Sequence, residues 1–547
     1  MNAYTSPKYS QNKRPMRSFF IIILLMISGG FHFQSSNARI IRVPGDSSTI
    51  QAGINGASGG DTVLVSKGLY YERINFLGKR ILVASNFIFD QDTNTIDSTI
   101  IDADADLMVQ NSGIIGTSDT GSVVCFLSGE DSESRISGFT IRNGWGFEYS
   151  EWSAGGGIVC FSSSPQISYN KIVNNIAFYG GGICCLNVDS SPLIIGNRFV
   201  ENHAAIGGAI LCESSSPLII DNVFLDNHAN NKGGAIFFKI CSPIIINNHM
   251  EKNTTDGYGG GICGHSGSLT LLENRIIQNS CMTKGGGLYC AALFSAVIGN
   301  NLFYKNSAQN GGGIYSYNCS SFILNNAIVE NSSTQGAGGI LCDGSVYHPT
   351  IINNIIGFSP AGEGIRCENN STPFISYNDL WSNASGNFSG CPAGVGDTSW
   401  GGNFNGTRSD SFYNIIRDPL FVDAVNFRLS CNSPCVDAGD PSYSVPPDSG
   451  GCRIDMGFQE YPYILGDANS DGSISPYSFK HIKPGRHLAL KGSVTIGDVL
   501  FMVNYLFVDG IPPCPFHSAD TNCDGAVNIA DIVCLLNYLF CQGPLPC

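Results

Sequence analysis

The feature that most constrains this chain is a glycine-rich segment that recurs about every 26 residues from position 155 onward. Nine such segments, among them GGAILC at 207–212 and GGAIFF at 233–238, carry one large apolar residue at the same place. These anchors are 25, 27, 26, 26, 26, 26, 26 and 25 residues apart and are Ile158, Ile183, Ile210, Ile236, Ile262, Leu288, Ile314, Ile340 and Ile365. So constant a period indicates a repeat protein in which each unit adopts one conformation.

Each unit consists of short β-prone stretches with no room for a helix. The glycine-rich start is followed by a stretch such as SPLIIDN and then by one such as NVFLDN, all bounded by Gly, Asn, Ser or Pro. Three short strands per unit, joined by turns, predict one coil of a parallel β-helix and hence a mainly β solenoid. Alternation along the first strand places Ile210 inward, Leu211 outward and Cys212 inward.

Equivalent inward residues should stack from coil to coil at a spacing of about 4.8 Å. One column would consist of Cys160, Cys185, Cys212, Cys290, Cys342 and Cys367. We interpret these cysteines as small buried hydrophobes, although neighbouring coils could bring some of them within disulfide reach. Inner asparagines such as Asn222, Asn274 and Asn326 should form another column, in which each amide hydrogen-bonds to the next.

The paired glycine-rich and FxxN motifs resemble the repeats of polymorphic outer-membrane proteins and related pectin-lyase-like surface proteins. The resemblance implies a right-handed parallel β-helix. STIQAGINGASGGDTVLVSKG, from residue 48, resembles the cap of that superfamily, and DPLFVDAVNFRLSCNSPCVDAGDP, from residue 418, resembles its closing cassette. The β-helix is therefore expected over 39–461, with the cap and first coils at 40–150, regular coils at 155–391 and the cassette at 392–461.

Residues 1–38 have the pattern of a cleaved secretory signal peptide. Four basic residues precede the apolar run FFIIILLMIS, which is too short to span a bilayer, and small residues follow it. The alternative is an uncleaved anchor. Removal of the segment removes four positive charges and no negative ones, so the net charge changes from −15 to −19. We expect a secreted protein, extracellular or attached to the cell surface, and no nucleic-acid partner or membrane insertion after cleavage.

The stretch DTNCDGAVNIAD near the C-terminus has the pattern of an EF-hand-like calcium loop. Oxygen ligands are expected at loop positions 1, 3, 5, 7 and 12, with glycine at position 6. These ligands would be Asp520, Asn522, Asp524, the carbonyl of Ala526 and Asp531. The apolar stretch IVCLLNYLF that follows predicts a helix.

A second loop begins in the same way at DANSDGS but ends twenty residues late. Asp467, Asn469, Asp471 and the carbonyl of Ser473 begin it, and Asp498 would complete it. Deleting Ile474–Ser493 restores a twelve-residue loop, DANSDGSVTIGD. The inserted segment holds four basic residues and no acidic one. Closing the loop over the insert costs roughly 2–3 kcal/mol, against about 8 kcal/mol from a micromolar calcium site, so we expect a weakened site.

The two loops, each followed by an NYLF-containing helix and 33 residues apart once the insert is removed, resemble a type I dockerin over 462–547. That resemblance implies two Ca²⁺ ions and calcium-dependent docking to a cohesin on a scaffold or cell-surface protein. It also implies that loop positions 10 and 11 face the cohesin; these are Ile496, Gly497, Ile529 and Ala530.

No recognisable catalytic set is present. Glycoside hydrolysis needs two carboxylates facing one cleft, and uronate elimination needs a basic residue beside groups that neutralise the acid. Basic residues of the coils, such as Lys239 and Arg275, occur singly. The alternating acids Asp102, Asp104 and Asp106 could bind an ion, but we favour a solvated strand face.

The best candidate for binding carbohydrate is GWGFEYSEW at 144–152, which contains Trp145, Phe147, Tyr149 and Trp152. Aromatic faces suit sugar rings, and the alternative is a lid over coil edges. The leading hypothesis is a non-catalytic β-helix that is adhesive or binds carbohydrate and is displayed through its dockerin. The alternative is a dockerin-tethered polysaccharide lyase or glycoside hydrolase.

Overall fold

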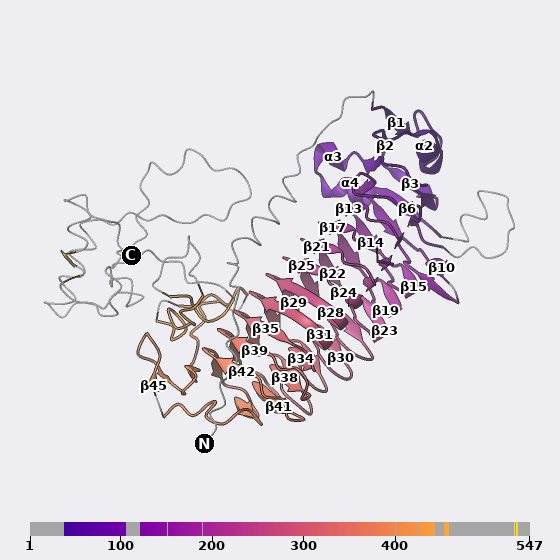
Figure 1. Ribbon diagram of the computed structural model, residues 1–547. Coiled ribbons are helices and arrows are strands. Elements are labelled where there is room, and N and C mark those ends of the chain that lie inside the picture. Colours follow the sequence, from indigo (N-terminus) through magenta and orange to yellow (C-terminus); the bar gives the residue numbers. More distant parts are fainter. Residues whose placement is uncertain are drawn as a thin grey trace, which may run out of the picture. The chain divides into compact units, whose positions relative to one another are not determined.

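The computed structural model describes residues 38–104, 121–149, 151–188, 190–399, 401–423, 425–430, 432–443, 453–458, 530 and 532–533. Within the compact unit Ile40–Cys547, the described chain from Ile40 onward forms a parallel β-solenoid of about 13 turns (Figure 1). The mainly β, parallel solenoid expected from the 26-residue period is confirmed. The predicted signal peptide, apart from Ala38, and almost all of the predicted dockerin lie outside the described residues.

Five of the nine regular coils contain four separate strands, whereas the sequence predicted three in each coil. The coil that begins at Ile183 contributes β16 (Ile183–Leu186), β17 (Leu193–Ile195), β18 (Arg198–Val200) and β19 (His203–Ile206). The fourth strand was missed because it runs directly into the next glycine-rich start and no turn residue separates the two in the sequence. The strands stack into three parallel sheets, here named A, B and C.

Sheet A contains two runs of strands, which β28 and β31 join. The first run is β4 (Ile74–Asn75), β7 (Val124–Phe126), β12 (Ile158–Phe161), β16, β20 (Ile210–Glu213), β24 (Ile236–Cys241), β28 (Ile262–Leu272), β31 (Leu288–Gly299), β34 (Ile314–Tyr317), β38 (Ile340–Asp343), β41 (Ile365–Glu368) and β44 (Phe388–Ser389). The second is β1 (Ile40–Val43), β2 (Thr62–Val65), β5 (Leu82–Ser85), β8 (Arg135–Ser137), β13 (Gln166–Ser168), β17, β21 (Leu218–Ile220), β25 (Ile244–Ile246), β28, β31, β35 (Ser321–Leu324), β39 (Thr350–Ile352) and β42 (Phe374–Ser376).

The other two sheets each take one strand from successive coils. Sheet B is β3 (Gly68–Tyr71), β6 (Thr99–Asp102), β9 (Thr140–Arg142), β14 (Lys171–Val173), β18, β22 (Val223–Leu225), β26 (His249–Glu251), β29 (Arg275–Ile277), β32 (Leu302–Tyr304), β36 (Ala327–Val329), β40 (Ile355–Gly357) and β43 (Asp379–Trp381). Sheet C is β10 (Phe147–Tyr149), β11 (Trp152–Ala154), β15 (Ile176–Tyr179), β19, β23 (His228–Lys232), β27 (Thr254–Thr255), β30 (Ser280–Cys281), β33 (Ser307–Ala308) and β37 (Ser332–Ser333). A separate pair is formed by β45 (Gly401–Gly402) and β46 (Arg408–Ser409).

Helix α2 (Ile50–Gly56) covers the core at the first coils. Thr49 caps it by accepting a hydrogen bond from the Ala52 amide (3.1 Å), and Ile50 and Ile54 bury their side chains in the core. The helix thus keeps the first apolar layer from water. Two further short helices, α3 (Phe87–Asp90) and α4 (Thr93–Ser98), follow β5.

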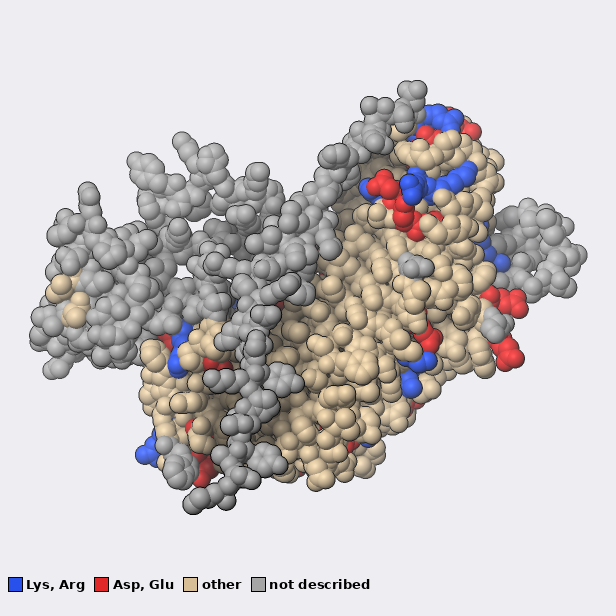
Figure 2. All heavy atoms as spheres, in the orientation of Figure 1, with Lys and Arg blue, Asp and Glu red and all other residues tan. Residues whose placement is uncertain are grey.

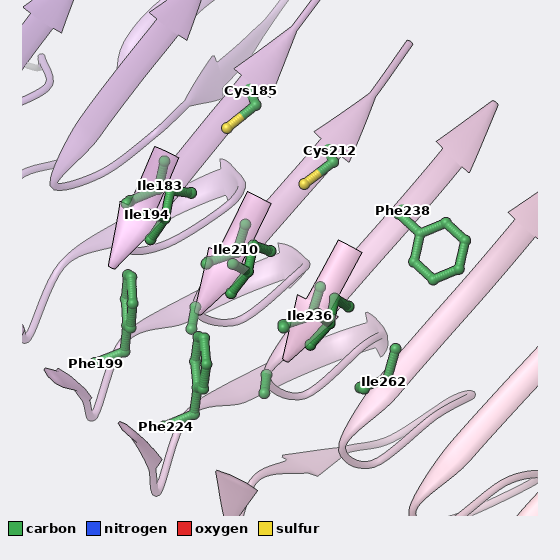
Figure 3. Close-up of a cluster of buried hydrophobic side chains, with 14 of the residues drawn as sticks. Ile183, Cys185, Ile194, Phe199, Ile210, Cys212, Phe224, Ile236, Phe238 and Ile262 are labelled. Carbon is green, nitrogen blue, oxygen red and sulfur yellow. The ribbon is translucent and has the colours of Figure 1, made fainter. Parts of the chain in front are cut away.

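The interior is built from columns of like residues. Ile183, Ile210 and Ile236 are direct cross-strand partners, and all three are fully buried (Figure 3). The six cysteines of the predicted column are buried as well, and burial raises the pKa of Cys160 and Cys290, so these thiols stay protonated. Phe238 interrupts the cysteine column and leaves room only for a glycine on the next coil, since a Cβ at Gly264 would lie 2.2 Å from the Phe238 ring.

The glycine-rich starts are required by the close approach of successive coils. Gly180 has a left-handed backbone (φ +62) that turns the chain from sheet C into sheet A. A Cβ on the next residue, Gly181, would lie 2.5 Å from the carbonyl oxygens of both His203 and Gly208. No side chain fits there, which explains why the glycine-rich start is retained in unit after unit.

Two continuous asparagine ladders run through the turns, as the sequence predicted for one. In the first, Asn222, Asn248 and Asn274 each donate their amide to the side-chain oxygen of the next member, at 2.9–3.0 Å. In the second, Asn227 donates to Asn253 and Asn253 to Asn279, at 2.8 and 2.9 Å. Each side chain also bonds to backbone groups, so polar atoms in the buried turns find partners.

We predict that Asn253→Ala lowers the free energy of unfolding by about 3 kcal/mol, because it leaves several buried groups without partners. Fully buried Asn253 donates to the Phe224 carbonyl (3.0 Å) and accepts from the Asn227 backbone amide (3.1 Å), besides its two side-chain contacts. Urea denaturation measures the change. The matched control is Asn231→Ala, which removes an exposed asparagine and should cost less than about 0.5 kcal/mol. Equal losses in the two variants would contradict a stabilising ladder.

After the last coil, the chain returns across the outside of sheet B. The Arg275 guanidinium donates to the carbonyl of Val425 (2.6 Å), and the Phe427 ring packs edge-on against Tyr304 at 4.9 Å. Farther along, the Gly457 amide donates to the Asn353 carbonyl (2.7 Å). This returning segment shields the apolar side chains of Leu302, Ala327 and Val329, which face outward from sheet B.

The returning segment also buries a carboxyl group completely. Asp379 accepts hydrogen bonds from the Arg417 amide and the Cys435 thiol, both at 3.1 Å. Burial raises the pKa of Asp379 to about 7, and Asp418 adds to the shift, whereas the two hydrogen bonds oppose it. The folded state therefore favours the protonated carboxyl. The stability that this protonation contributes is fully present below the unfolded pKa near 4, and it is lost as the pH rises through about 7.

We predict that Asp379→Asn flattens the pH dependence of stability. The wild-type free energy of unfolding should fall by up to about 4 kcal/mol more than that of the variant between pH 4 and pH 8. Denaturation curves of both proteins at several pH values measure the difference. Asp226→Asn, at an exposed turn, is the control and should retain the wild-type slope. An unchanged slope in Asp379→Asn would disprove the coupling.

Candidate functional site: the outer strip

One column of residues that point away from the main core along sheet A is itself largely buried. Leu211 was expected to face outward; it does, but it is only 1% exposed. Its column belongs to a second apolar cluster that includes Cys184, Leu211, Phe237, Cys263, Tyr289, Tyr315 and Leu341. Half-buried residues beside the glycine turns pack against this cluster, among them Tyr179 and Tyr258.

Three neighbouring columns on this side of sheet A form a surface that we call the outer strip. The turn column is Tyr179, Ile206, Lys232, Tyr258, Lys284 and Asn310. The middle column is Cys184, Leu211, Phe237, Cys263, Tyr289, Tyr315, Leu341 and Arg366. The far column is Leu186, Glu213, Lys239, His265, Ala291, Tyr317, Asp343 and Glu368.

His265 lies in the far column next to Lys239 of the preceding coil, and Lys232 is near enough for its charge to act on the imidazole. Burial, and then the positive charges of Lys232 and Lys239, lower the pKa of His265. The imidazole is therefore neutral at neutral pH and can accept a proton. Its ring lies 5.8 Å from that of Tyr289, which in turn lies 5.1 Å from that of Tyr258.

Lys239 remains charged because Glu213 lies beside it. Its Nζ is 2.8 Å from the Glu213 carboxylate, and this contact raises the pKa of Lys239. Both side chains are partly exposed, so the pair can exchange its partners for a ligand at little cost. Lys232 lies 5.9 Å from the Phe237 ring, a cation–π contact that keeps its ammonium group on the strip.

Tyr315, three coils after Lys239, links Lys284 to Asp343. Lys284 Nζ lies 2.7 Å from the Tyr315 hydroxyl and 4.6 Å from the centre of its ring, and that hydroxyl donates to Asp343. Asn369 also donates to Asp343 (2.6 Å). Burial, and then the bond to Asp343, raise the pKa of Tyr315, so it stays protonated. With every member partnered, this group braces the strip and does not supply a free base.

The aromatic stretch singled out in the sequence lies at the head of the same strip. It forms the hairpin β10–β11, and β11 is hydrogen-bonded to β15 at the start of sheet C. Tyr149 packs against Phe161 at 5.9 Å and against the second apolar cluster, as a lid would. Trp145 and Trp152 are 50% and 46% exposed, and Trp152 stacks on Phe178 at 4.0 Å. The lid interpretation describes Tyr149, and carbohydrate binding by the exposed Trp145 and Trp152 stays a prediction.

Phe147, the remaining aromatic candidate, is half-buried in β10. The hypothesis of a solvated face for the alternating acids is wrong for Asp102, which is 1% exposed and pairs with Arg142 Nε at 2.7 Å. Neutralised in this way, Asp102 is structural. Asp106 lies outside the described residues.

The predicted calcium ligands and cohesin-facing positions lie outside the described residues, except for Ala530 in the second predicted loop. Ala530 is helical and exposed. Within the part of the chain that the structure describes, no group of three or more His, Cys, Asp and Glu side chains could hold a metal ion. In the same part, no helix is long and apolar enough to cross a membrane.

Sequence reasoning missed His265, Lys232 and Tyr258 because it followed only the inward positions. Aligning the units on their anchors would have revealed the columns, since His265 stands three residues after Ile262 as Lys239 does after Ile236. The lysines that occur singly along the chain are brought beside one another by the coils. The face shown in Figure 2 carries few charged residues. Its largest group of charged residues lies around the N-terminal elements.

Comparison with known proteins gives one short family match and distant structural similarities. A model described as the Chlamydia polymorphic membrane protein repeat matches residues 223–239, which run from the end of one coil into the first strand of the next. No curated protein matches the chain.

Three solved structures resemble this chain at low TM-scores. Pectate lyase Pel9A is 14% identical with a TM-score of 0.31, over 78% of this chain and 98% of that one. A PL6-family alginate lyase is 13% identical (TM-score 0.30, 75% and 60%). The A-module of a mannuronan C-5 epimerase from Azotobacter vinelandii is 13% identical (TM-score 0.28, 63% and 91%). At such identities the likeness concerns the fold and not the activity.

Proposed function

We propose that this protein binds an extended acidic polysaccharide along the outer strip. The observation that carries the proposal is the grouping of His265, Lys232 and Lys239 beside Tyr258 on consecutive coils. Partly exposed rings offer apolar faces to sugars, and the ammonium groups offer charge to carboxylates. Successive coils repeat at about 4.8 Å, which is the scale of a single sugar residue. Each coil can therefore contact about one sugar of an extended chain.

The hairpin β10–β11 extends this surface toward the N-terminus. Exposed Trp145 and Trp152 stand at the head of sheet C, on the same side as Tyr149 and Tyr179, which pack against the second apolar cluster. A long ligand could therefore contact exposed aromatic residues at one end and the lysines in the middle. The buried rings of Tyr289 and Tyr315 support the surface and are not faces for stacking.

A second function, polysaccharide elimination, is favoured by the state of His265. In uronate elimination a base removes the proton next to the carboxylate carbon, a carbon–carbon double bond forms, and the glycosidic oxygen leaves. A neutral imidazole flanked by two ammonium groups supplies a base and the charge that stabilises the developing carboxylate dianion. In this alternative, His265 would be the base and Lys232 and Lys239 would hold the uronate.

We predict that the wild-type protein binds a polyuronate more tightly than a neutral glucan, and that Tyr258→Ala or Lys239→Met weakens binding about tenfold. Calorimetry with oligouronates measures the affinity. Lys171→Met, which changes a lysine of sheet B, is the matched control and should bind like wild type. Equal weakening in all three variants would contradict a site on the strip.

The same mixtures decide between binding and elimination. Unsaturated uronate released by wild type and lost in His265→Ala, with binding retained, would establish the lyase. Binding without product would leave the protein a non-catalytic receptor. Neither binding nor product with any polyuronate would overturn the proposal.

We also propose that the chain is exported and displayed through its C-terminal pair of loops. The support is the loop pattern itself, with the ligands at Asp520, Asn522, Asp524, Ala526 and Asp531 contiguous and those of the first loop separated by the insert. Docking to a cohesin would hold the β-helix at a scaffold or cell surface. This half of the proposal is independent of the outer strip.

We predict that Asp524→Ala abolishes more calcium binding by the full-length chain than Asp471→Ala does. Deleting Ile474–Ser493 should tighten the first site by at most about a hundredfold, because closing the loop no longer includes the insert. Calcium calorimetry measures both effects. Unchanged affinity after the deletion would show that the insert costs the site nothing, and absence of calcium binding in wild type would refute the display hypothesis.

A further inference from the structure

The last coil of the solenoid brings two cysteine sulfurs into contact. Cys367 lies in β41, and Cys391 follows β44, the final strand of sheet A. Their Sγ atoms are 3.3 Å apart, and both thiols are free in this structure. A disulfide needs a separation of about 2.05 Å, so the sulfurs must approach by about 1.2 Å, which small side-chain rotations can supply.

The geometry of this pair differs from that of the stacked cysteines. Cys160 and Cys185, Cys185 and Cys212, and Cys342 and Cys367 are direct cross-strand partners in parallel sheets. In that register the Cα–Cβ bonds run parallel, and the Cβ atoms stay about 4.8 Å apart, beyond the mean of about 3.8 Å in disulfides. The stacked pairs are therefore poorly placed to form disulfides.

Cys391 escapes this restriction because the chain turns just before it. Arg366 pairs with Ser389, which places Gly390 beside Cys367. Gly390 has a left-handed backbone (φ +64), and a Cβ there would lie 2.3 Å from the Cys367 carbonyl oxygen. The turn brings the next residue, Cys391, diagonally over the sulfur of Cys367.

Left-handed residues also precede cysteines in two earlier coils, at another position of the repeat, without producing a sulfur pair. Ile240 and Asn318 also have left-handed backbones (φ +55 and +46) and are followed by Cys241 and Cys319. Cys241 directs its thiol to the carbonyl of Cys212 (3.1 Å), and Cys319 directs its thiol to that of Tyr317 (3.3 Å). Cys319 therefore serves as a control cysteine that also follows a left-handed residue but contacts backbone.

The pair is also accessible to an oxidant. Cys391 is half-buried, whereas Cys160, Cys185 and Cys212 are fully buried. Cys367 is 9% exposed and lies directly beneath Cys391. A small disulfide can thus reach Cys391 first, with Cys367 placed to attack next.

From this geometry we infer that Cys367 and Cys391 form an oxidation-dependent disulfide that closes the last coil. Cys391 loses its thiol proton, and its sulfur attacks a low-molecular-weight disulfide, which releases one thiol and forms a mixed disulfide. The contact with Cys367 and burial raise the pKa of Cys391, so the reaction should be faster at alkaline pH. The thiolate of Cys367 then attacks the Cys391 sulfur and releases the second thiol. The protein loses two electrons and two protons, and the oxidant is reduced to two thiols.

The bond would fasten the end of the solenoid where no further coil covers it. It closes a loop of 24 residue steps that contains β42 and β43. The bond would restrict the conformations of the opened last coil, and this would stabilise the closed coil. The effect is local because each coil contacts mainly its neighbours. Reduction would free this end, while the stacked cysteines stay unchanged.

The test uses full-length protein treated with oxidised glutathione, followed by alkylation of free thiols and peptide mapping without reductant. A peptide pair joining Cys367 to Cys391 is expected, and it should disappear on reduction and in Cys391→Ser. Cys319→Ser is the matched control and should retain the linkage. Proteolytic cleavage within 369–390 should be about tenfold slower in the oxidised protein.

Three outcomes would overturn the inference. They are alkylated Cys391 after oxidation of the folded protein, glutathione retained on Cys391, and a bridge from either cysteine to a different partner. Mapping of the wild-type protein decides these even if Cys391→Ser fails to fold.

Discussion

The structure depends on backbone hydrogen bonds that join successive coils at a constant register. The Ile183 amide donates to Ala209 at 2.8 Å and the Ile210 amide to Ala235 at 2.9 Å, so residues about 26 positions apart become neighbours. Since the register hardly shifts, each position of the repeat becomes a column running along the solenoid. A residue suited to one coil is thereby suited to the next, which explains the uniform isoleucine anchors and the glycine-rich starts.

This constraint also determines how polar groups are buried. Turns inside a solenoid cannot reach water, so their backbone groups need partners within the chain. The two asparagine ladders supply those partners, because an amide both donates and accepts and can repeat without limit along the column. Asp379 behaves differently from the ladder asparagines, because it is an ionisable group. Burial without a neighbouring cation raises its pKa to about 7.

In the outer strip, the stacking of coils also brings titratable side chains together. His265, Lys232 and Lys239 belong to different coils, and only stacking makes them one electrostatic unit. Tyr315 and Lys284 brace the strip in the same way, with each charge matched by a neighbour. At the last coil the alignment of equivalent residues ends. The left-handed Gly390 then brings Cys391 next to Cys367, although the two are not cross-strand partners.

The sequence by itself determined the solenoid, its coil length, the inward isoleucines and cysteines, and the asparagine ladder, because all of these follow from a period and an alternation that can be read along the chain. The tertiary structure alone decided the burial of Leu211, the fourth strand at His203–Ile206 and the meeting of His265 with two lysines. These depend on packing between residues that are far apart in the chain. Tyr179 and Tyr258 pack against the second apolar cluster beside the glycine turns, and the Tyr258 ring lies 5.1 Å from that of Tyr289, which no one-dimensional pattern specifies.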